Sequence, residues 1–276
     1  MSLEAAEQAV RDGDLQAALR QLQDQIKQQP ARADLRVFLF QLLSVLGQWE
    51  RALTQLNVAA DLDATTLAMA QMYREAIKCE ALRADVFAGK MSPVVFGQPE
   101  EWLALLIESM LVHGRSRPAE AQSLRARAFE SAPTTTGSLD NQPFEWIADA
   151  DMRLGPVCEA VINGRYYWVP FERLARIDIE APVDLRDVVW MPAHFEFANG
   201  GEAVGVIPTR YPGSETADEA VLALARKTIW REDAPDVFSG IGQRILTTDN
   251  GEHPIMDVRS IVLGDGATAP AEGGNA

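Results

Sequence analysis

The sequence has only two cysteines, Cys79 and Cys158, and three histidines among its 276 residues. Two distant cysteines make no disulfide framework and are typical of a reducing compartment. Three scattered histidines, with no His-Glu-x-x-His motif, argue against a histidine-rich metal site. The Gly-x-Ser-x-Gly and phosphate-binding-loop motifs are also missing from the sequence. We therefore expect no catalytic residue, no metal ligand and no cofactor.

Basic residues are also scarce, with 25 Lys and Arg against 40 Asp and Glu and a net charge of −15. The second half is the more acidic, because residues 134–276 hold 11 basic and 23 acidic groups. Nucleic-acid binding requires a basic face, so we expect none, and a partner of the second half should be basic or neutral. No apolar run approaches the ~18 residues of a membrane span, and the start is unlike a signal peptide. We expect a cytoplasmic protein without membrane contact.

A helical repeat is present in the first half. Gly13-Asp14-Leu15 and Gly47-Gln48-Trp49 lie 34 residues apart, and the match continues through the next two turns. This period, with Gly at the turn and Ala in the second helix, is typical of tetratricopeptide hairpins. Such hairpins bury their apolar faces only against neighbouring hairpins. We therefore predict a tetratricopeptide-like helical domain over residues 1–132.

The predicted helix over residues 34–46 is apolar nearly all round, which is typical of a helix covered on both sides. Further helices are expected over residues 65–83, 99–113 and 118–132, from apolar spacing and from the prolines that start or end them. One interpretation covers the apolar helix completely with its neighbours. The alternative leaves one edge open as a groove for a partner helix. The residues expected in that groove are Val37, Phe40, Gln41, Met69 and Tyr73.

The second half is expected to begin after a polar, Pro- and Gly-containing linker at residues 132–143. Three Asn-Gly dipeptides, at 163, 199 and 250, each separate two runs rich in β-branched and aromatic residues, which predicts antiparallel hairpins. Thr216 and Glu219 have the spacing of a capping box for a helix over about 217–227. We predict an α+β domain over residues 144–263, followed by a disordered tail at 264–276.

The stretch at residues 144–170 concentrates aromatic and acidic side chains. We expect its tryptophans, Trp146 and Trp168, to join Trp190 and Trp230 in the core. Asp149 and Asp151 form an Asp-x-Asp pair, which has two interpretations. One is a divalent-cation site, although a hard cation usually needs more oxygen ligands than two carboxylates supply. The favoured one is a turn in which each carboxylate caps backbone N–H groups or pairs with an arginine.

Six segments together resemble a known family. They are WIADADMRLGP at 146–156, NGRYYWVPFER at 163–173, APVDLRDVVWMPA at 181–193, NGGE at 199–202, IPTRYPGSE at 207–215 and GIGQRILTTD at 240–249. This order is similar to that of the ImpE/SciE family, also called TagJ, which are accessory proteins of type VI secretion systems. The resemblance extends to the helical first half and so covers nearly the whole chain. The motif residues to which it assigns a structural or interaction role are Trp146, Asp149, Asp151, Arg153, Arg186, Asp187, Arg210, Gln243 and Arg244.

The resemblance implies an adaptor rather than an enzyme. Members of the family are associated with the contractile sheath and with ClpV, the ATPase that disassembles contracted sheaths. The implied partners are the N-terminal helix of the small sheath subunit and ClpV itself. Two alternatives stay open: a tetratricopeptide-type chaperone for a secreted effector, and a metal-dependent enzyme that uses Asp149 and Asp151.

Overall fold

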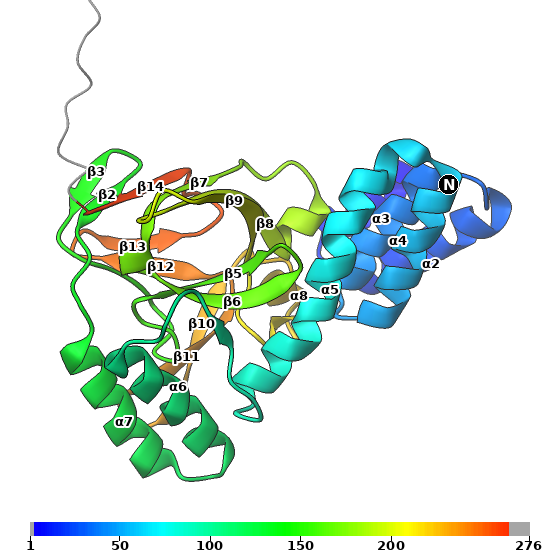
Figure 1. Ribbon diagram of the computed structural model, residues 1–276. Coiled ribbons are helices and arrows are strands. Elements are labelled where there is room, and N and C mark those ends of the chain that lie inside the picture. The colour runs from blue at the N-terminus through cyan, green and yellow to red at the C-terminus, as the bar shows by residue number, and fades with distance from the viewer. Residues whose placement is uncertain (1–2, 265–276) are drawn as a thin grey trace, which may run out of the picture.

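The computed structural model describes residues 3–264, in which two groups of helices flank a domain built of β-sheets (Figure 1). The predicted α+β class, with a helical first half and antiparallel hairpins after it, is confirmed. Of the tail expected at 264–276, all but Gly264 lies outside the described residues. Within residues 3–264, no helix has the length and apolar character needed to cross a bilayer.

The first five helices stack side by side as antiparallel hairpins (Figure 1). The turns between α1 and α2 and between α3 and α4 contain Gly13 and Gly47, whose φ angles of 83° and 65° favour glycine. The hairpins predicted from the 34-residue period are therefore present; their assignment as tetratricopeptide repeats stays a prediction. The five helices are α1 (Leu3–Arg11), α2 (Leu15–Gln28), α3 (Ala33–Val45), α4 (Trp49–Leu62) and α5 (Leu67–Phe87).

Two more helices, α6 (Glu101–Gly114) and α7 (Pro118–Ser131), form a hairpin, which is the second helical group (Figure 1). This hairpin packs below the β-domain, next to strands β10 and β11, and the end of α6 lies close to the end of α5 at Gly89 and Gly114. The predicted start at Pro118 is confirmed. Proline suits this position because the first turn of a helix does not need its missing N–H. The β-domain is thus held between two helical groups.

The β-domain contains a nine-stranded sheet, a three-stranded sheet and a two-stranded ribbon. The nine-stranded sheet has the order β1-β6-β5-β9-β8-β7-β14-β2-β3, the three-stranded sheet β13-β12-β4, and β10 pairs with β11. Apart from the parallel pair β1–β6, these pairings are antiparallel. The strands are β1 (Val94–Val95), β2 (Gly137–Leu139), β3 (Gln142–Phe144), β4 (Ile147–Asp149), β5 (Val157–Ile162), β6 (Arg165–Pro170), β7 (Leu174–Ile179), β8 (Trp190–Phe197), β9 (Glu202–Pro208), β10 (Thr228–Ala234), β11 (Val237–Gly242), β12 (Ile245–Thr248), β13 (Gly251–Pro254) and β14 (Ser260–Leu263).

All three hairpins predicted from the Asn-Gly dipeptides are confirmed, as β5–β6, β8–β9 and β12–β13. The β5–β6 turn has φ angles of 50° at Asn163 and 72° at Gly164, as a tight turn of type I′ requires. The segment expected to be a linker also contains a hairpin, β2–β3. Its turn residues Asp140 and Asn141 have φ angles of 48° and 68°. Asp-Asn therefore supplies the two positive φ angles that Asn-Gly supplies in the β5–β6 turn.

The apolar core has two parts, which meet at the nine-stranded sheet. β5 shows how they divide, because all six of its residues are buried and alternate residues face opposite sides. Val157 and Val161 belong to the cluster that includes the helices, whereas Ala160 and Ile162 belong to the cluster between the sheets. The helical stack therefore shares a continuous core with one face of the sheet.

The prediction of one helix over about 217–227 is wrong, because the helix in the structure is much shorter. The structure has a 3-10 turn at Ser214–Thr216 and one short helix, α8 (Ala220–Ala223). Thr216 does not cap α8, because its hydroxyl donates to the carbonyl of Gly213 at 3.1 Å. Glu219 is the residue that precedes α8, and its carboxylate accepts a hydrogen bond from Lys227 at 3.1 Å. Local hydrogen bonds of this kind replace the capping box.

The expectation that four tryptophans build the core is correct for two of them. Trp168 and Trp190 are fully buried, and their indole N–H groups donate to Tyr166 and Glu80 at 2.7 and 2.8 Å. Trp146 and Trp230 are 39% and 36% exposed, so for them the prediction is wrong. Trp146 lies at the start of β4 and Trp230 in the β10–β11 ribbon, both at the edge of the β-domain, where one side of a large ring stays uncovered.

Candidate functional site: a buried ionic network and the cleft beside it

A buried ionic network joins α5 to the β-domain, and Glu159 of β5 is at its centre. Arg83 of α5 donates from Nε to Glu159 Oε1 at 2.7 Å, and Arg244 forms an ion pair with Oε2. The hydroxyl of Tyr166 also donates to this carboxylate. Burial by itself would raise the pKa of Glu159, but the two arginines outweigh it and lower that pKa to about 2. Glu159 is therefore ionised at neutral pH, and its negative charge is shared by Arg83 and Arg244.

Asp149 of β4 is the second acid of the network. It forms an ion pair with Arg244 and accepts hydrogen bonds from the Tyr211 hydroxyl and the Asp151 N–H, each at 2.9 Å. Burial raises the pKa of Asp149 to about 6, because the single arginine that it shares with Glu159 does not offset the loss of water. Two carboxylates with one common arginine therefore have opposite pKa shifts.

Asp151 is held separately, by Arg153 and by the backbone. Arg153 Nε donates to Asp151 Oδ1 at 2.9 Å, and the Gly240 N–H donates to Oδ2 at 2.9 Å. The guanidinium of Arg153 lies 4.8 Å from the ring centre of Phe87. The arginine-pairing interpretation of the Asp-x-Asp pair is thus the one that the structure shows. A cation at this pair would have to displace Arg153 and Arg244.

Arg210 fastens the C-terminal end of α3 to the β-domain. Its Nη1 donates to the carbonyl of Val45 at 2.8 Å, and a cation is favourable at the end of a helix where carbonyls are unpaired. The carbonyl of Arg210 in turn accepts from Arg83 at 2.7 Å. Gln243, which bridges Arg210 through the backbone, donates to the carbonyl of Ala225 at 2.6 Å. Arg210 and Gln243 are therefore structural links between helices and sheet.

Arg186 and Asp187 lie on the 3-10 turn Leu185–Val188, which packs against α3. Asp187 is fully buried and accepts from the Val183 N–H at 2.8 Å. Arg186 stacks over Tyr73 of α5, with 5.0 Å between the guanidinium carbon and the ring centre. Of the motif residues named from the sequence, Asp149 and Arg244 meet in the network, and Trp146 lies outside it.

The five residues expected to line a groove for a partner helix do not share one open surface. Phe40, Gln41 and Tyr73 are buried, and Tyr73 packs between Phe40 and Trp190 with ring centres 5.8 and 5.7 Å away. Val37 and Met69 are half-buried. A partner would therefore contact this region through Val37 and Met69, and their role in binding stays a prediction.

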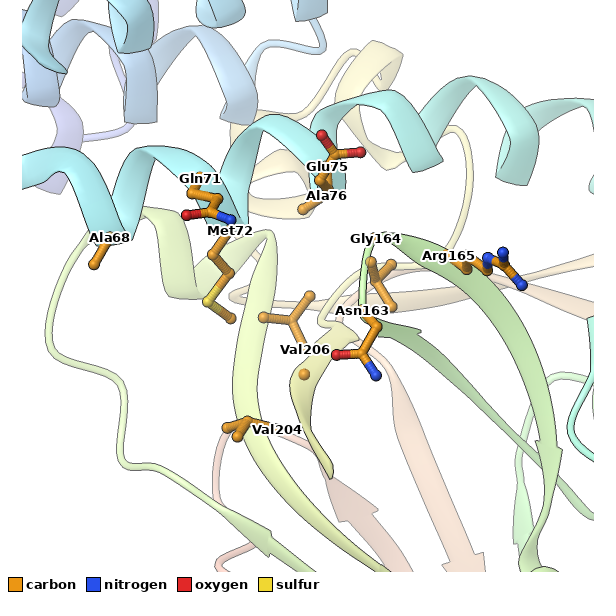
Figure 2. Close-up of a pocket in the computed structure, with 12 residues that line it drawn as sticks. Ala68, Gln71, Met72, Glu75, Ala76, Asn163, Gly164, Arg165, Val204 and Val206 are labelled. Atoms are coloured by element: carbon orange, nitrogen blue, oxygen red, sulfur yellow. The ribbon is translucent and has the colours of Figure 1, made fainter. Parts of the chain in front are cut away.

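A large cleft lies beside α5, where the helix passes over β9 and the β5–β6 turn (Figure 2). It has a volume of about 700 Å³ and is open to solvent on one side. Small residues of α5, Ala68 and Ala76, leave room in it, and Met72 reaches into it toward Val204 and Val206 of β9 (Figure 2). Glu75 and Arg165 lie at its rim. We call this surface the α5–β9 cleft.

Exposed apolar side chains and an unpaired strand edge mark the α5–β9 cleft. Met72 is 36% and Val204 is 69% exposed. β5 pairs with β9 at Gly205 and Val206 and then turns away at Asn163. Among the described residues, the Glu202–Val204 part of β9 therefore has a strand partner on one side, β8, and no strand on the other. Large exposed apolar side chains beside a free strand edge are typical of binding surfaces.

One group of side chains has metal-ligand character. Ligand atoms of Asp178, His194 and Glu196 lie within 4.8 Å of one another on the outer face of β7 and β8. Asp178, however, is paired with Arg176 at 2.7 Å, and His194 lies 3.4 Å from Glu202. The arginine next to the carboxylate opposes a cation there, so we assign no metal to this group.

Sequence reasoning did not identify the residues that complete the network: Arg83, Glu159, Tyr211 and Glu80, whose carboxylate lies 3.5 Å from Arg83 Nη1. One of them carries a signal, because Glu159 is a single acid within the apolar run VCEAVI. A charge in such a run must be paired once the strand is buried. The sequence does not show which arginines pair with it, because Arg83 and Arg244 are 76 and 85 positions away.

Known proteins match this chain over nearly its whole length. The family model described as ImpE protein matches residues 141–262. The type VI secretion system accessory component TagJ of Pseudomonas aeruginosa is 47% identical over 256 residues, which cover 93% of this chain and 90% of that protein. The chain belongs to the ImpE family. The residues that make up the buried network lie mainly within the part that the family model matches.

The fold is also similar to a solved structure. The crystal structure of protein VPA1032 from Vibrio parahaemolyticus superimposes with a TM-score of 0.85 at 26% identity. The match covers 95% of this chain and 98% of that one, so it includes both helical groups as well as the β-domain. The ImpE-family resemblance that the sequence motifs indicated is therefore confirmed.

Proposed function

We propose that this protein is a non-catalytic, cytoplasmic adaptor of a type VI secretion system. In this proposal it binds the N-terminal helix of the small sheath subunit and modulates the disassembly and recycling of the sheath by ClpV. The observation that carries the proposal is the 47% identity to an accessory component of such a system over 93% of the chain. The buried network supports a non-catalytic role, because Asp149, Asp151 and Glu159 are all engaged by arginines.

The α5–β9 cleft is the surface that we propose for the partner helix. An amphipathic helix needs an apolar wall that its own apolar side chains can enter. Ala68 and Val204 supply such a wall, with the buried Ala76 and Val206 behind them, and the flexible side chain of Met72 can adapt to what binds. The half-buried Val37 and Met69 are the alternative contact residues.

Co-purification from cells tests the proposal. A tagged form of the protein should retain the small sheath subunit when the secretion system is expressed. A secreted effector in its place would instead favour the effector-chaperone alternative. Repeating the experiment in cells that lack the sheath subunit shows whether ClpV is retained directly. Retention of neither sheath subunit nor ClpV, with the tagged protein folded, would contradict the adaptor proposal.

A further inference from the structure

Arg125, on α7, is a buried cation that lines a small pocket. Only 4% of the surface of Arg125 is exposed. The pocket lies where the α6–α7 hairpin meets the β10–β11 ribbon, and its polar lining comes from Arg125, His113, Arg153 and Asp233. Met110 and Val237 supply part of its apolar wall. It is a different place from the α5–β9 cleft, and none of its residues takes part in that surface.

Arg125 has no direct ionic or hydrogen-bonded partner within residues 3–264. Its Nε is buried without a hydrogen-bond acceptor, and no carboxylate of the described chain lies within ion-pair distance of its guanidinium. The neighbouring Arg153, in contrast, has an ionic partner, because it is paired with Asp151. Two arginines and two carboxylates, Asp151 and Asp233, therefore meet here, but Asp151 is taken by Arg153 and Asp233 forms no ion pair with Arg125, so this guanidinium has no direct partner among the described residues.

A buried charge without a partner strongly disfavours the folded state. The effect is visible at Arg125: burial lowers its pKa, and although Asp151 attracts the proton, Arg153 repels it. Asp233 is the nearest other acid, but it is exposed and stands at the bulge of β10, between Glu232 and Ala234. Its place is at the rim of the pocket rather than against the guanidinium.

We infer that the Arg125 pocket binds a small inorganic anion of about the size of chloride. The free volume of the pocket, about 10 Å³, admits one small occupant and is too small for a phosphate or a peptide carboxylate. A guanidinium that lines an enclosed space presents several N–H donors to such an anion. The anion supplies the direct partner that neither Asp151 nor Asp233 gives to Arg125, and it ties the α6–α7 hairpin to the β10–β11 ribbon.

Bromide is a suitable probe, because it resembles chloride and is visible by anomalous X-ray scattering. Crystals of the full chain grown or soaked in sodium bromide should show an anomalous peak in contact with the Arg125 guanidinium. In solution, bromide should raise the melting temperature relative to sodium gluconate at equal ionic strength, since a ligand of the folded state stabilises by mass action. The rise should continue with bromide concentration until the site is saturated.

Two variants test the assignment to Arg125. Arg125→Met keeps the length of the side chain but removes the charge, and it should abolish the bromide-specific rise. Asp233→Asn removes the competing carboxylate at the rim and should lower the bromide concentration that gives half of the rise. An equal rise in wild type and Arg125→Met would overturn the proposal. So would a crystal structure in bromide that shows Arg125 paired with Asp233 and no anomalous peak, and this result does not depend on how the variants fold.

Discussion

At the scale of single residues, the charge balance around Glu159 determines how tightly α5 is held to the β-domain. Arg83 and Arg244 both pair with Glu159, each has a second acid, Glu80 or Asp149, and the exposure of Glu159 and the two arginines is 5% or less. Replacing buried ion pairs with apolar side chains can be neutral, but removing one member leaves a buried charge uncompensated. The two arginines therefore make Glu159 more sensitive to substitution than an acid at the surface.

Glu159→Gln should lower the free energy of unfolding by about 3–5 kcal/mol, the range typical of a broken buried ion pair. Glu75→Gln, at the rim of the cleft on the same helix as Arg83, is the matched control and should change it by less than about 0.5 kcal/mol. Urea denaturation followed by circular dichroism measures both. Equal stability of the two variants would show that the network contributes little.

Asp149 predicts a pH dependence, since burial raises its pKa from 3.8 to about 6. Folding takes up a proton in that interval. The stabilisation that protonated Asp149 provides is therefore fully present below its unfolded pKa of 3.8 and is lost as the pH rises through about 6. Between pH 4.5 and 7.5 this amounts to about 2 kcal/mol, at about 1.4 kcal/mol per pKa unit. Glu159 does not interfere, because its pKa is lowered to about 2 and it stays ionised over this range.

Asp149→Asn isolates that group, because asparagine has the shape of the protonated acid and does not titrate. The free energy of unfolding of the variant, minus that of wild type, should rise by about 2 kcal/mol from pH 4.5 to 7.5. Denaturant titrations at several pH values in the interval measure this difference. A difference that is constant with pH, or that falls as the pH rises, would contradict the raised pKa of Asp149.

At the scale of elements, the two equivalent hairpin turns of the helical stack differ in what surrounds them. A Cβ at Gly13 would meet no atom closer than 4.0 Å, whereas a Cβ at Gly47 would lie 2.5 Å from the Cγ of Glu215 and 3.0 Å from its Cβ. The second turn thus lies directly against the β-domain, at the 3-10 turn Ser214–Thr216. Although the repeat gives the two glycines the same backbone role, the tertiary contact distinguishes them.

Gly13→Ala and Gly47→Ala form a matched pair of variants. Both place alanine at a positive φ, which costs about 1–2 kcal/mol. Gly47→Ala should cost measurably more, because the added methyl group also displaces Glu215. The difference between the two free energies of unfolding measures the contact between the α3–α4 turn and the β-domain. Identical losses would mean that this contact is loose.

Elements whose signals are local were predictable from the sequence. The Asn-Gly turns, the glycine turns of the helical hairpins and the proline at the start of α7 each determine a backbone conformation within a few residues. The capping box at Thr216 was not a reliable signal. Ala225 adopts a φ of 53° and Arg226 donates to the carbonyl of Arg11, which draws the chain away from a longer helix. A distant contact of this kind leaves no periodic pattern in the sequence.

The candidate site was less predictable than the fold, for the same physical reason. That Asp149 and Asp151 pair with arginines follows from their chemistry, but the identity of each arginine follows from the fold. Arg153 is two positions from Asp151, whereas Arg244 is 95 positions from Asp149. The apolar spacing of Phe40 and Tyr73 predicted that they face inward or line a groove. In the structure Trp190 of the β-domain packs on Tyr73, so Tyr73 faces inward, and the sequence does not show this contact.

At the scale of the whole molecule, the helical stack and the β-domain form one continuous core. Trp190 of β8 lies 5.8 Å from Trp49 of α4 and 5.7 Å from Tyr73 of α5, measured between ring centres. Together with the pairing of Arg83 and Glu159, this packing fixes α5 over the sheet. The α5–β9 cleft is therefore a preformed surface between a helix and a strand, and preformed surfaces bind with a smaller entropic loss.

The central claim is that this cleft receives a helix of the sheath. The most direct test is a calorimetric titration with a peptide from the N-terminal helix of the cognate small sheath subunit. Wild type should bind saturably with a negative heat-capacity change, the mark of apolar burial. Met72→Asp should weaken binding at least tenfold, since it would bury a carboxylate against the peptide. Leu82→Asp, on the same helix and 45% exposed but outside the cleft, should bind as wild type does.

A third variant, Val37→Asp, distinguishes the alternative surface on α3. If the account is correct, it binds the peptide with wild-type affinity. Weaker binding by Val37→Asp together with unchanged binding by Met72→Asp would move the site to the α3 surface and contradict the cleft. Failure of the folded wild-type protein to bind the peptide at all would contradict recognition of the sheath helix itself.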